Sequence, residues 1–181
     1  MSTAMEAGGR SREGVLASTP AGKAALFVAI LGGVVALDLV TKLIIMQNFN
    51  LYEQVDVIGS YVRLTYIHNP GAAFGIDVGP HSRIIFLVLS IIALVALAGM
   101  YWFTPAKDRT RLASIALICG GAVGNMLDRI RSSSGVVDFI DVGVGDVRWP
   151  VFNVADIGVT VGAVILALSL WREEPRGDRG G

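Results

Sequence analysis

Four apolar segments, each about long enough to cross a lipid bilayer, constrain the fold of this chain most strongly. They cover residues 24–46, 83–103, 112–130 and 153–171. A helix needs about 20 predominantly apolar residues to cross the hydrocarbon core, and it satisfies its own backbone hydrogen bonds there. Of the 181 residues, 53% are hydrophobic and only 17% are charged, which is too apolar for an ordinary soluble domain. The sequence therefore predicts an α-helical membrane protein with four transmembrane helices.

The segment between the first two predicted helices has a different pattern. Over residues 51–76, apolar residues such as Val55 and Val57 alternate with polar ones on both sides of Gly59. Alternation with period two around a turn is typical of a β-hairpin. We therefore predict a small extracytoplasmic β-rich insert at 51–76. The stretch 131–150 is rich in Gly, Ser and Asp, and we predict a polar loop there.

Both ends of the chain are more polar than the membrane segments. We predict a disordered cytoplasmic tail over residues 1–22, one four-helix membrane domain over 23–172, and a second cytoplasmic tail over 173–181. The first apolar segment is longer than the apolar core of a signal peptide, and no clear cleavage site follows it. We therefore expect this segment to remain as a helix.

Positive charge is distributed unevenly between the two sides that four spans would create. The two tails and the loop after the second segment carry nine basic residues, which are Arg10, Arg12, Lys23, Lys107, Arg109, Arg111, Arg172, Arg176 and Arg179. The opposite loops carry four, which are Arg63, Arg83, Arg131 and Arg148. Because loops rich in Lys and Arg stay in the cytoplasm, we expect both termini inside and both larger loops outside.

That orientation brings polar residues from separate segments to the outer membrane boundary. These residues are Asp38, Asn69, Asn125, Arg129, Asp138, Asn153 and Asp156. Polar residues scattered at random along four helices would not collect at one depth. We therefore predict a functional site at this boundary.

Two of these residues, Asp138 and Asp156, are suited to act as a pair. An ionised carboxylate beside hydrocarbon loses hydration, and two at one depth also repel each other. Sharing one proton relieves this repulsion and separates their apparent pKa values. One carboxylate can then take a proton from water while the other donates one to the scissile carbonyl. The sequence therefore predicts a membrane-embedded aspartic peptidase.

Other acids near the boundary have simpler roles. Asp128 competes with Asp138 as the second acid, but it neighbours Arg129, and we expect it to form a salt bridge or a cap. Asp38 and Lys42 are four residues apart on one helical face and can pair. Such a pair either stabilises the helix or supports a nearby site.

Of four further polar residues, one has two roles that remain open and three have a single expected role. Asn153 either faces the site beside Asp156 or caps the last helix. His68 lies near a Pro-Gly turn, and we expect a hydrogen-bonded loop histidine. Asp141 and Asp146 are expected to be solvated loop acids.

Five stretches of the chain, taken in order, resemble the lipoprotein signal peptidase (signal peptidase II) family. They are Asp38-Leu-Val-Thr-Lys42, Asn69-Pro-Gly-Ala-Ala-Phe-Gly75, Gly120-Gly-Ala-Val-Gly-Asn-Met-Leu-Asp-Arg129, Val137-Asp138-Phe139 and Phe152-Asn-Val-Ala-Asp156. Each stretch alone is a weak signal, but five in this order are specific. The resemblance extends from about residue 24 to residue 172.

The resemblance implies an aspartic endopeptidase that removes signal peptides from diacylglyceryl-modified bacterial prolipoproteins, cutting before the lipidated cysteine. It implies a multi-pass protein of the cytoplasmic (inner) membrane with its site at the outer face. It also implies Asp138 and Asp156 as the catalytic pair, and a small extracytoplasmic β-cradle. The supporting residues it implies are Asn69, Asn125, Arg129, Asn153, Asp38 and Lys42. We expect contacts with membrane lipids, no metal or cofactor, and a monomer.

Composition weighs against other classes of function. A net charge of zero gives no electrostatic case for binding nucleic acid. The single cysteine, Cys119, and two histidines supply neither a zinc cluster nor a Cys/His nucleophile. A small ion- or solute-conducting membrane protein is the alternative, but its polar residues should continue through the bilayer. A scaffold would explain the glycine pairs Gly120/Gly124 and Gly158/Gly162 but not two unmatched acids.

Overall fold

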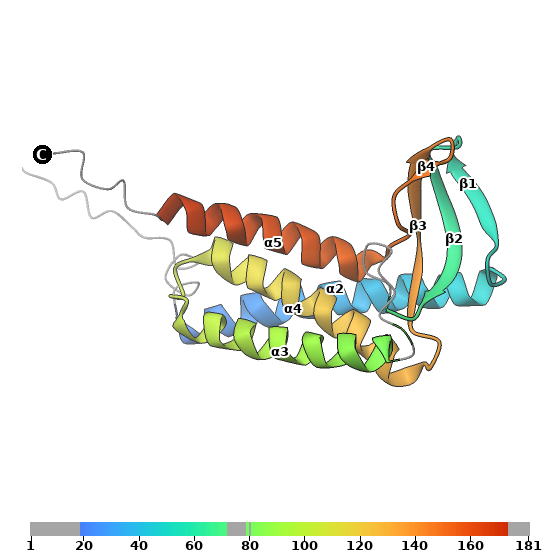
Figure 1. Cartoon of the computed structure of the whole chain (residues 1–181). Helices are drawn as coiled ribbons and strands as arrows, with labels where there is room; N and C mark the ends of the chain where they lie inside the picture. The colour runs from blue at the N-terminus through green and yellow to red at the C-terminus, as the bar shows by residue number, and fades with distance from the viewer. Residues whose placement is uncertain (1–18, 72–78, 80, 174–181) are drawn as a thin grey trace, which may run out of the picture.

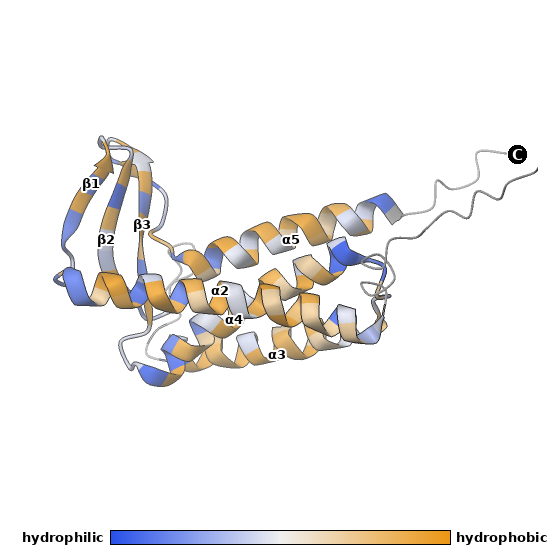
Figure 2. Ribbon diagram, turned by 180° about the vertical axis from the view of Figure 1, so that it is seen from behind, coloured by the Kyte–Doolittle hydropathy of each residue, from blue (hydrophilic) through white to orange (hydrophobic). Residues whose placement is uncertain are grey.

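The computed structural model describes residues 19–71, 79 and 81–173. Within this part of the chain, four helices are long and apolar enough to cross a membrane, and α4 packs against the other three. These helices are α2 (Pro20–Asn48), α3 (Ser82–Phe103), α4 (Arg109–Arg131) and α5 (Val154–Glu173). Figure 2 shows apolar residues along most of each helix. The four predicted transmembrane helices are therefore confirmed.

The helices extend beyond the predicted apolar segments because polar residues cap their ends. Thr19 accepts a hydrogen bond from Gly22 N at 3.1 Å, and Pro20 occupies the first helical turn. Residues 20–22, predicted as tail, are therefore helical. Residues 1–18 and 174–181, and Ala72 to Gly75 of the second family motif, lie outside the described residues.

The glycine pairs allow the helices to approach closely. A Cβ atom on Gly124 would lie 2.6 Å from the Asp38 carboxylate, and one on Gly120 would lie 2.8 Å from Val34. A Cβ on Gly162 would lie 2.7 Å from the carbonyl oxygen of Ser114. These glycines therefore pack α4 against α2 and α5, as small residues do in membrane bundles.

Four antiparallel strands form one sheet in the order β1-β2-β3-β4. The predicted hairpin is confirmed as β1 (Gln54–Ile58) and β2 (Val62–Asn69). The prediction of a polar loop over 131–150 is wrong, because β3 (Val136–Val144) and β4 (Val147–Arg148) lie there. Strand β3 pairs with β2, and its apolar residues Val137 and Phe139 are buried.

Asp141 is the second correction in this region. It was expected to be solvated, but it is 4% exposed and accepts hydrogen bonds from Arg148 Nε at 2.6 Å and Thr65 Oγ1 at 3.2 Å. Asp146 is exposed, as expected. The ion pair of Asp141 with Arg148 links β3 to β4. An acid that looks solvated in the sequence therefore stabilises the contact between these two strands.

The sheet lies across one end of the helical bundle (Figure 1). The last turns of α2 extend beneath it, where Ile45 packs with Val137 and Phe139 in a buried cluster. At the opposite end, Lys23 Nζ donates to the carbonyl oxygens of Tyr101 and Thr104 at 2.6 and 2.8 Å. The start of α2 and the end of α3 are therefore at the end of the bundle farther from the sheet.

Candidate active site

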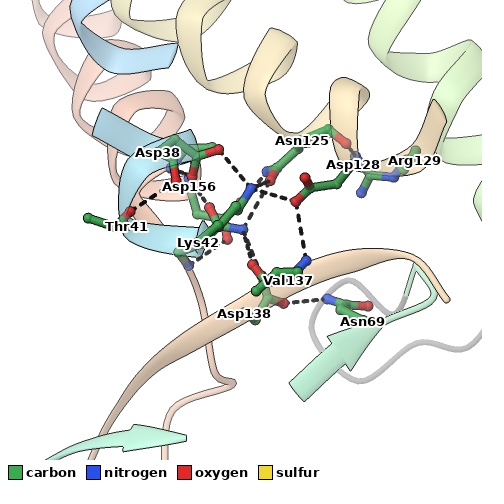
Figure 3. Close-up of polar contacts among 12 residues, drawn as sticks. Asp38, Thr41, Lys42, Asn69, Asn125, Asp128, Arg129, Val137, Asp138 and Asp156 are labelled. Atoms are coloured by element: carbon green, nitrogen blue, oxygen red, sulfur yellow. Dashed lines mark hydrogen bonds and ion pairs between the residues drawn. The ribbon is translucent and has the colours of Figure 1, made fainter. Parts of the chain in front are cut away.

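Asp138 lies near the start of β3, where the sheet meets the bundle, and it is 1% exposed. Its Oδ2 accepts a hydrogen bond from Asn69 Nδ2 at 3.0 Å, and its Oδ1 accepts one from Asn153 Nδ2 at 2.7 Å (Figure 3). Pairing of β2 with β3 aligns Ile67 with Asp138 and brings Asn69 close. The carboxyl group is thus held by amides from two separate segments.

Asp156 lies in the first turn of α5, where it and Asn153 cap the helix reciprocally. Asp156 N donates to Asn153 Oδ1 at 3.0 Å, and Asn153 N donates to Asp156 Oδ2 at 3.2 Å. Asn125 Nδ2 donates to Asp156 Oδ1 at 2.8 Å. The Asp156 carboxylate is therefore held by N–H donors at the N-terminal end of α5.

The side chains of Asn125 and Asn153 join the two acids. Asn153 Nδ2, which donates to Asp138, also lies 3.0 Å from Asn125 Oδ1. Asn125 in turn donates to Asp156. Both sequence alternatives for Asn153 therefore hold at once: it caps α5 and it faces Asp138.

The environment of Asp138 favours its protonated form. Burial removes hydration from the ionised carboxylate and, together with the negative charge of Asp156, raises the pKa of Asp138 to about 7. The hydrogen bonds from Asn69 and Asn153 oppose this shift in the pKa without cancelling it. The two acids thus have unlike environments, as an acid–base pair requires.

A buried ion cluster is joined through Asn125 to Asp156. Lys42, 1% exposed, places Nζ 2.7 Å from Asp38 Oδ2 and 2.8 Å from Asp128 Oδ2. The same Nζ donates to Asn125 Oδ1 at 3.1 Å. Since that oxygen accepts from Lys42, the amide nitrogen of Asn125 is left to face Asp156. The lysine therefore sets the orientation of the Asn125 amide.

The two acids of the ion cluster also hold the backbone beside each catalytic candidate. Asp38 Oδ1 accepts from Ala155 N at 2.9 Å, next to Asp156. Asp128 Oδ2 accepts from Val137 N at 3.2 Å, next to Asp138. Backbone contacts of this kind leave no pattern in the sequence, so sequence reasoning missed them.

Lys42 forms ion pairs with both Asp38 and Asp128. The predicted pairing of Asp38 with Lys42 is confirmed. Asp128 forms a salt bridge, as expected. Its partner is Lys42, 86 positions away, and not the neighbouring Arg129 on which the expectation was based. This arrangement leaves Asp128 bound to a cation and Asp138 held by amides.

Arg129 and His68 differ in their relation to the site. Arg129 donates to the carbonyl oxygen of Asn125 at 3.3 Å, and its Nε is buried without a hydrogen-bond partner among the described residues. Its guanidinium lies 5.5 Å from the Phe86 ring. His68 lies on β2, not in a loop, and its Nε2 is 3.0 Å from Tyr66 Oη. Of these two residues, Arg129 is the one whose charge interacts with Asp156 and Asp138.

The structure brings together all nine residues singled out from the sequence. They are Asp38, Lys42, Asn69, Asn125, Asp128, Arg129, Asp138, Asn153 and Asp156, and they come from α2, β2, α4, β3 and the start of α5 (Figure 3). Convergence was predicted for seven of them, all except Lys42 and Asp128, and the structure brings these seven together.

Comparisons with known proteins agree with this arrangement. The sequence profile of signal peptidase (SPase) II matches residues 30–172. The "Lipoprotein signal peptidase" of Moorella thermoacetica is 41% identical over 86% of this chain and 96% of its own length. That of Halothermothrix orenii is 41% identical over 80% and 94%. A solved structure of a bacterial membrane enzyme superposes with a TM-score of 0.74 at 30% identity, covering 86% of this chain and 93% of that one. This chain therefore belongs to the signal peptidase II family of membrane peptidases.

Proposed function

We propose that this protein removes signal peptides from diacylglyceryl-modified prolipoproteins by cutting before the lipidated cysteine. Membership of the family and the relatives called lipoprotein signal peptidases support this substrate class. A diacylated cysteine is held at the bilayer surface by its own acyl chains. The two acids come from β3 and from the first turn of α5. These elements meet where the sheet lies across the end of the helical bundle (Figure 1), which is the depth such a substrate would reach. The conducting alternative is not favoured.

The observation that carries the chemistry is the unlike environment of two joined carboxyl groups. Asp156, held by N–H donors at a helix N-terminus, is the general base that takes a proton from water. Asp138, buried and with its pKa raised to about 7, is the general acid that protonates the leaving amine. Water attacks the carbonyl carbon before the cysteine, the C–N bond breaks, and the two acids exchange protonation states.

The direct test uses purified protein and one precursor in two forms, with and without the diacylglyceryl group. We expect release of the intact signal peptide from the lipidated form, with the bond before the cysteine cut, and at least about tenfold slower release from the other. Mass spectrometry identifies the cut. Equal rates for both forms, or cleavage elsewhere, would contradict the proposed substrate.

We further propose that the protein lies in the cytoplasmic membrane with both termini inside and the two acids at the outer face. The uneven distribution of Lys and Arg supports this orientation. Lys107 and Ser134 are exposed at opposite ends of α4. In a Cys119→Ala background, we expect a membrane-impermeant thiol reagent to label Ser134→Cys from outside and Lys107→Cys only after lysis. Labelling of both positions in intact cells would exclude four spans in this orientation.

The activity is also expected to fall at alkaline pH. Because the pKa of Asp138 is raised to about 7, it keeps its proton below that pH and loses it above. The general acid is then missing, so kcat/KM should fall about tenfold per pH unit above the pKa of the free enzyme. A pH–rate profile from pH 5 to about 9 measures this. Activity that rises steadily over pH 7 to about 9 would be inconsistent with Asp138 as the acid.

A further inference from the structure

The far tip of the sheet carries exposed apolar side chains that the catalytic site does not use. The β1–β2 and β3–β4 turns meet there, because Gly143 N donates to Tyr61 O and Arg148 Nη1 donates to Ser60 O, both at 2.9 Å. The apolar tip, as we call it, has side chains 58–81% exposed and consists of Ile58, Tyr61, Val144, Val147 and Trp149. Such a cluster on a protein surface marks an interaction site.

The position of the apolar tip limits what can cover it. The strands run across the end of the bundle, and their turns project sideways beyond α5 in both views (Figures 1 and 2). The helices beside it have the length and composition to span a bilayer. A surface that projects past the side of such a bundle overlies lipid.

The chemistry of the apolar tip fits the headgroup boundary of a bilayer. Tryptophan and tyrosine, here Trp149 and Tyr61, are enriched at that boundary. Arg148 is engaged by Asp141 at 2.6 Å, and Asp146 adds an exposed negative charge between Val144 and Val147. Attraction to anionic lipid therefore does not explain binding here, whereas burial of apolar surface does.

We propose that the apolar tip inserts into the headgroup region of the leaflet on the sheet side of the membrane. The contact continues the surface that the helices already bury in lipid. Strand β3 carries Asp138 near one end and Val144 at the tip. Insertion therefore fixes the tilt of the strand that positions Asp138. This inference goes beyond the proposed function, and its test does not depend on cleavage.

The test reads the fluorescence of Trp149 in a protein carrying Trp102→Phe and Trp171→Phe, reconstituted into phosphatidylcholine vesicles with brominated acyl chains. Because interfacial side chains lie about 5–10 Å into the headgroup boundary, quenching should exceed that of the control at least about twofold. The control adds Trp149→Phe and Tyr52→Trp. Tyr52 is 72% exposed and lies between α2 and β1, on the far side of the sheet region from the other helices (Figure 1).

A second variant tests whether apolar burial causes the quenching. Val147 is 81% exposed, so Val147→Asp should fold normally. This variant should show less quenching of Trp149. Adding anionic lipid to the vesicles should leave the quenching of Trp149 unchanged. Equal quenching of Trp149 and the control would overturn the proposal. The proposal would also be overturned if Trp149 fluorescence shows that the side chain is shielded from water but not quenched by brominated lipid. Shielding that grows with protein concentration would indicate a second copy of the chain. Shielding that appears only with precursor would indicate a substrate surface.

Discussion

Asp138→Asn and Asp156→Asn are each expected to lower signal-peptide release by about 10²–10⁴-fold, the range that loss of a positioned acid or base causes. Asparagine keeps the shape of the side chain but cannot cycle a proton. Asp138 accepts from two amide donors, Asn69 and Asn153, so an asparagine there turns its own amide toward one of them. We therefore expect a stability loss of about 1–3 kcal/mol from that clash, too small to unfold the protein.

The double variant distinguishes a pair from two independent groups. If Asp138 and Asp156 act together, removing the second acid after the first should change the rate little, as for other catalytic units. Thermal unfolding in detergent checks that all three variants are folded. Losses that multiply in the double variant would contradict a shared mechanism.

Lys42→Met is expected to destabilise the protein by about 3–5 kcal/mol, because it leaves buried acids without their cation. Asp38 is 0% exposed and Asp128 is 9% exposed, so neither can recover full hydration. The change also removes the hydrogen bond that orients Asn125. Activity should fall with stability, since the cluster holds the backbone beside both catalytic candidates.

The matched control for Lys42→Met is Lys107→Met, at an exposed lysine between α3 and α4. Its free energy of unfolding should change by less than about 0.5 kcal/mol. Chemical unfolding in detergent micelles, followed by helical circular dichroism, compares the two. Equal free energies of unfolding for the two variants would show that the buried ion cluster does not stabilise the fold.

The sequence predicted the membrane helices because each is set by a local property, the length of an apolar run. Helix ends were predicted less accurately, because Thr19 caps α2 at Pro20 and the polar residues near Asn48 continue the helix past the end of the apolar segment. The hairpin was predictable from alternation around Gly59, where the backbone takes φ of +50°. These features depend on neighbours along the chain.

Strand β3 was missed because its acids interrupt the apolar pattern. These acids made residues 131–150 look like a polar loop, and Asp141 was expected to be solvated, yet Asp141 is only 4% exposed. Asp141 is held by Thr65, 76 positions away. Burial of an acid depends on donors that come together only in the fold, so composition alone misplaces it.

The site was predictable as a collection of residues but not as a network. Polar residues at one depth indicated a site, and Asp38 and Lys42 could be paired from helical spacing. The link from Lys42 to Asn125 joins residues 83 positions apart. No spacing rule covers such a contact, so the orientation of the amide that faces Asp156 follows only from the structure.

We expect Asp138, and not Asp128, to act with Asp156, and a comparison of two variants distinguishes these assignments. Signal-peptide release from a diacylglyceryl precursor is measured for purified Asp138→Asn and Asp128→Asn. Asp128→Asn loses a salt bridge to Lys42 but keeps an oxygen that can accept from Val137 N. We predict lowered stability but substantial turnover for Asp128→Asn, and a loss of turnover of about 10²–10⁴-fold for folded Asp138→Asn. Near-normal turnover by Asp138→Asn with none by folded Asp128→Asn would contradict the account and assign the second acid to Asp128.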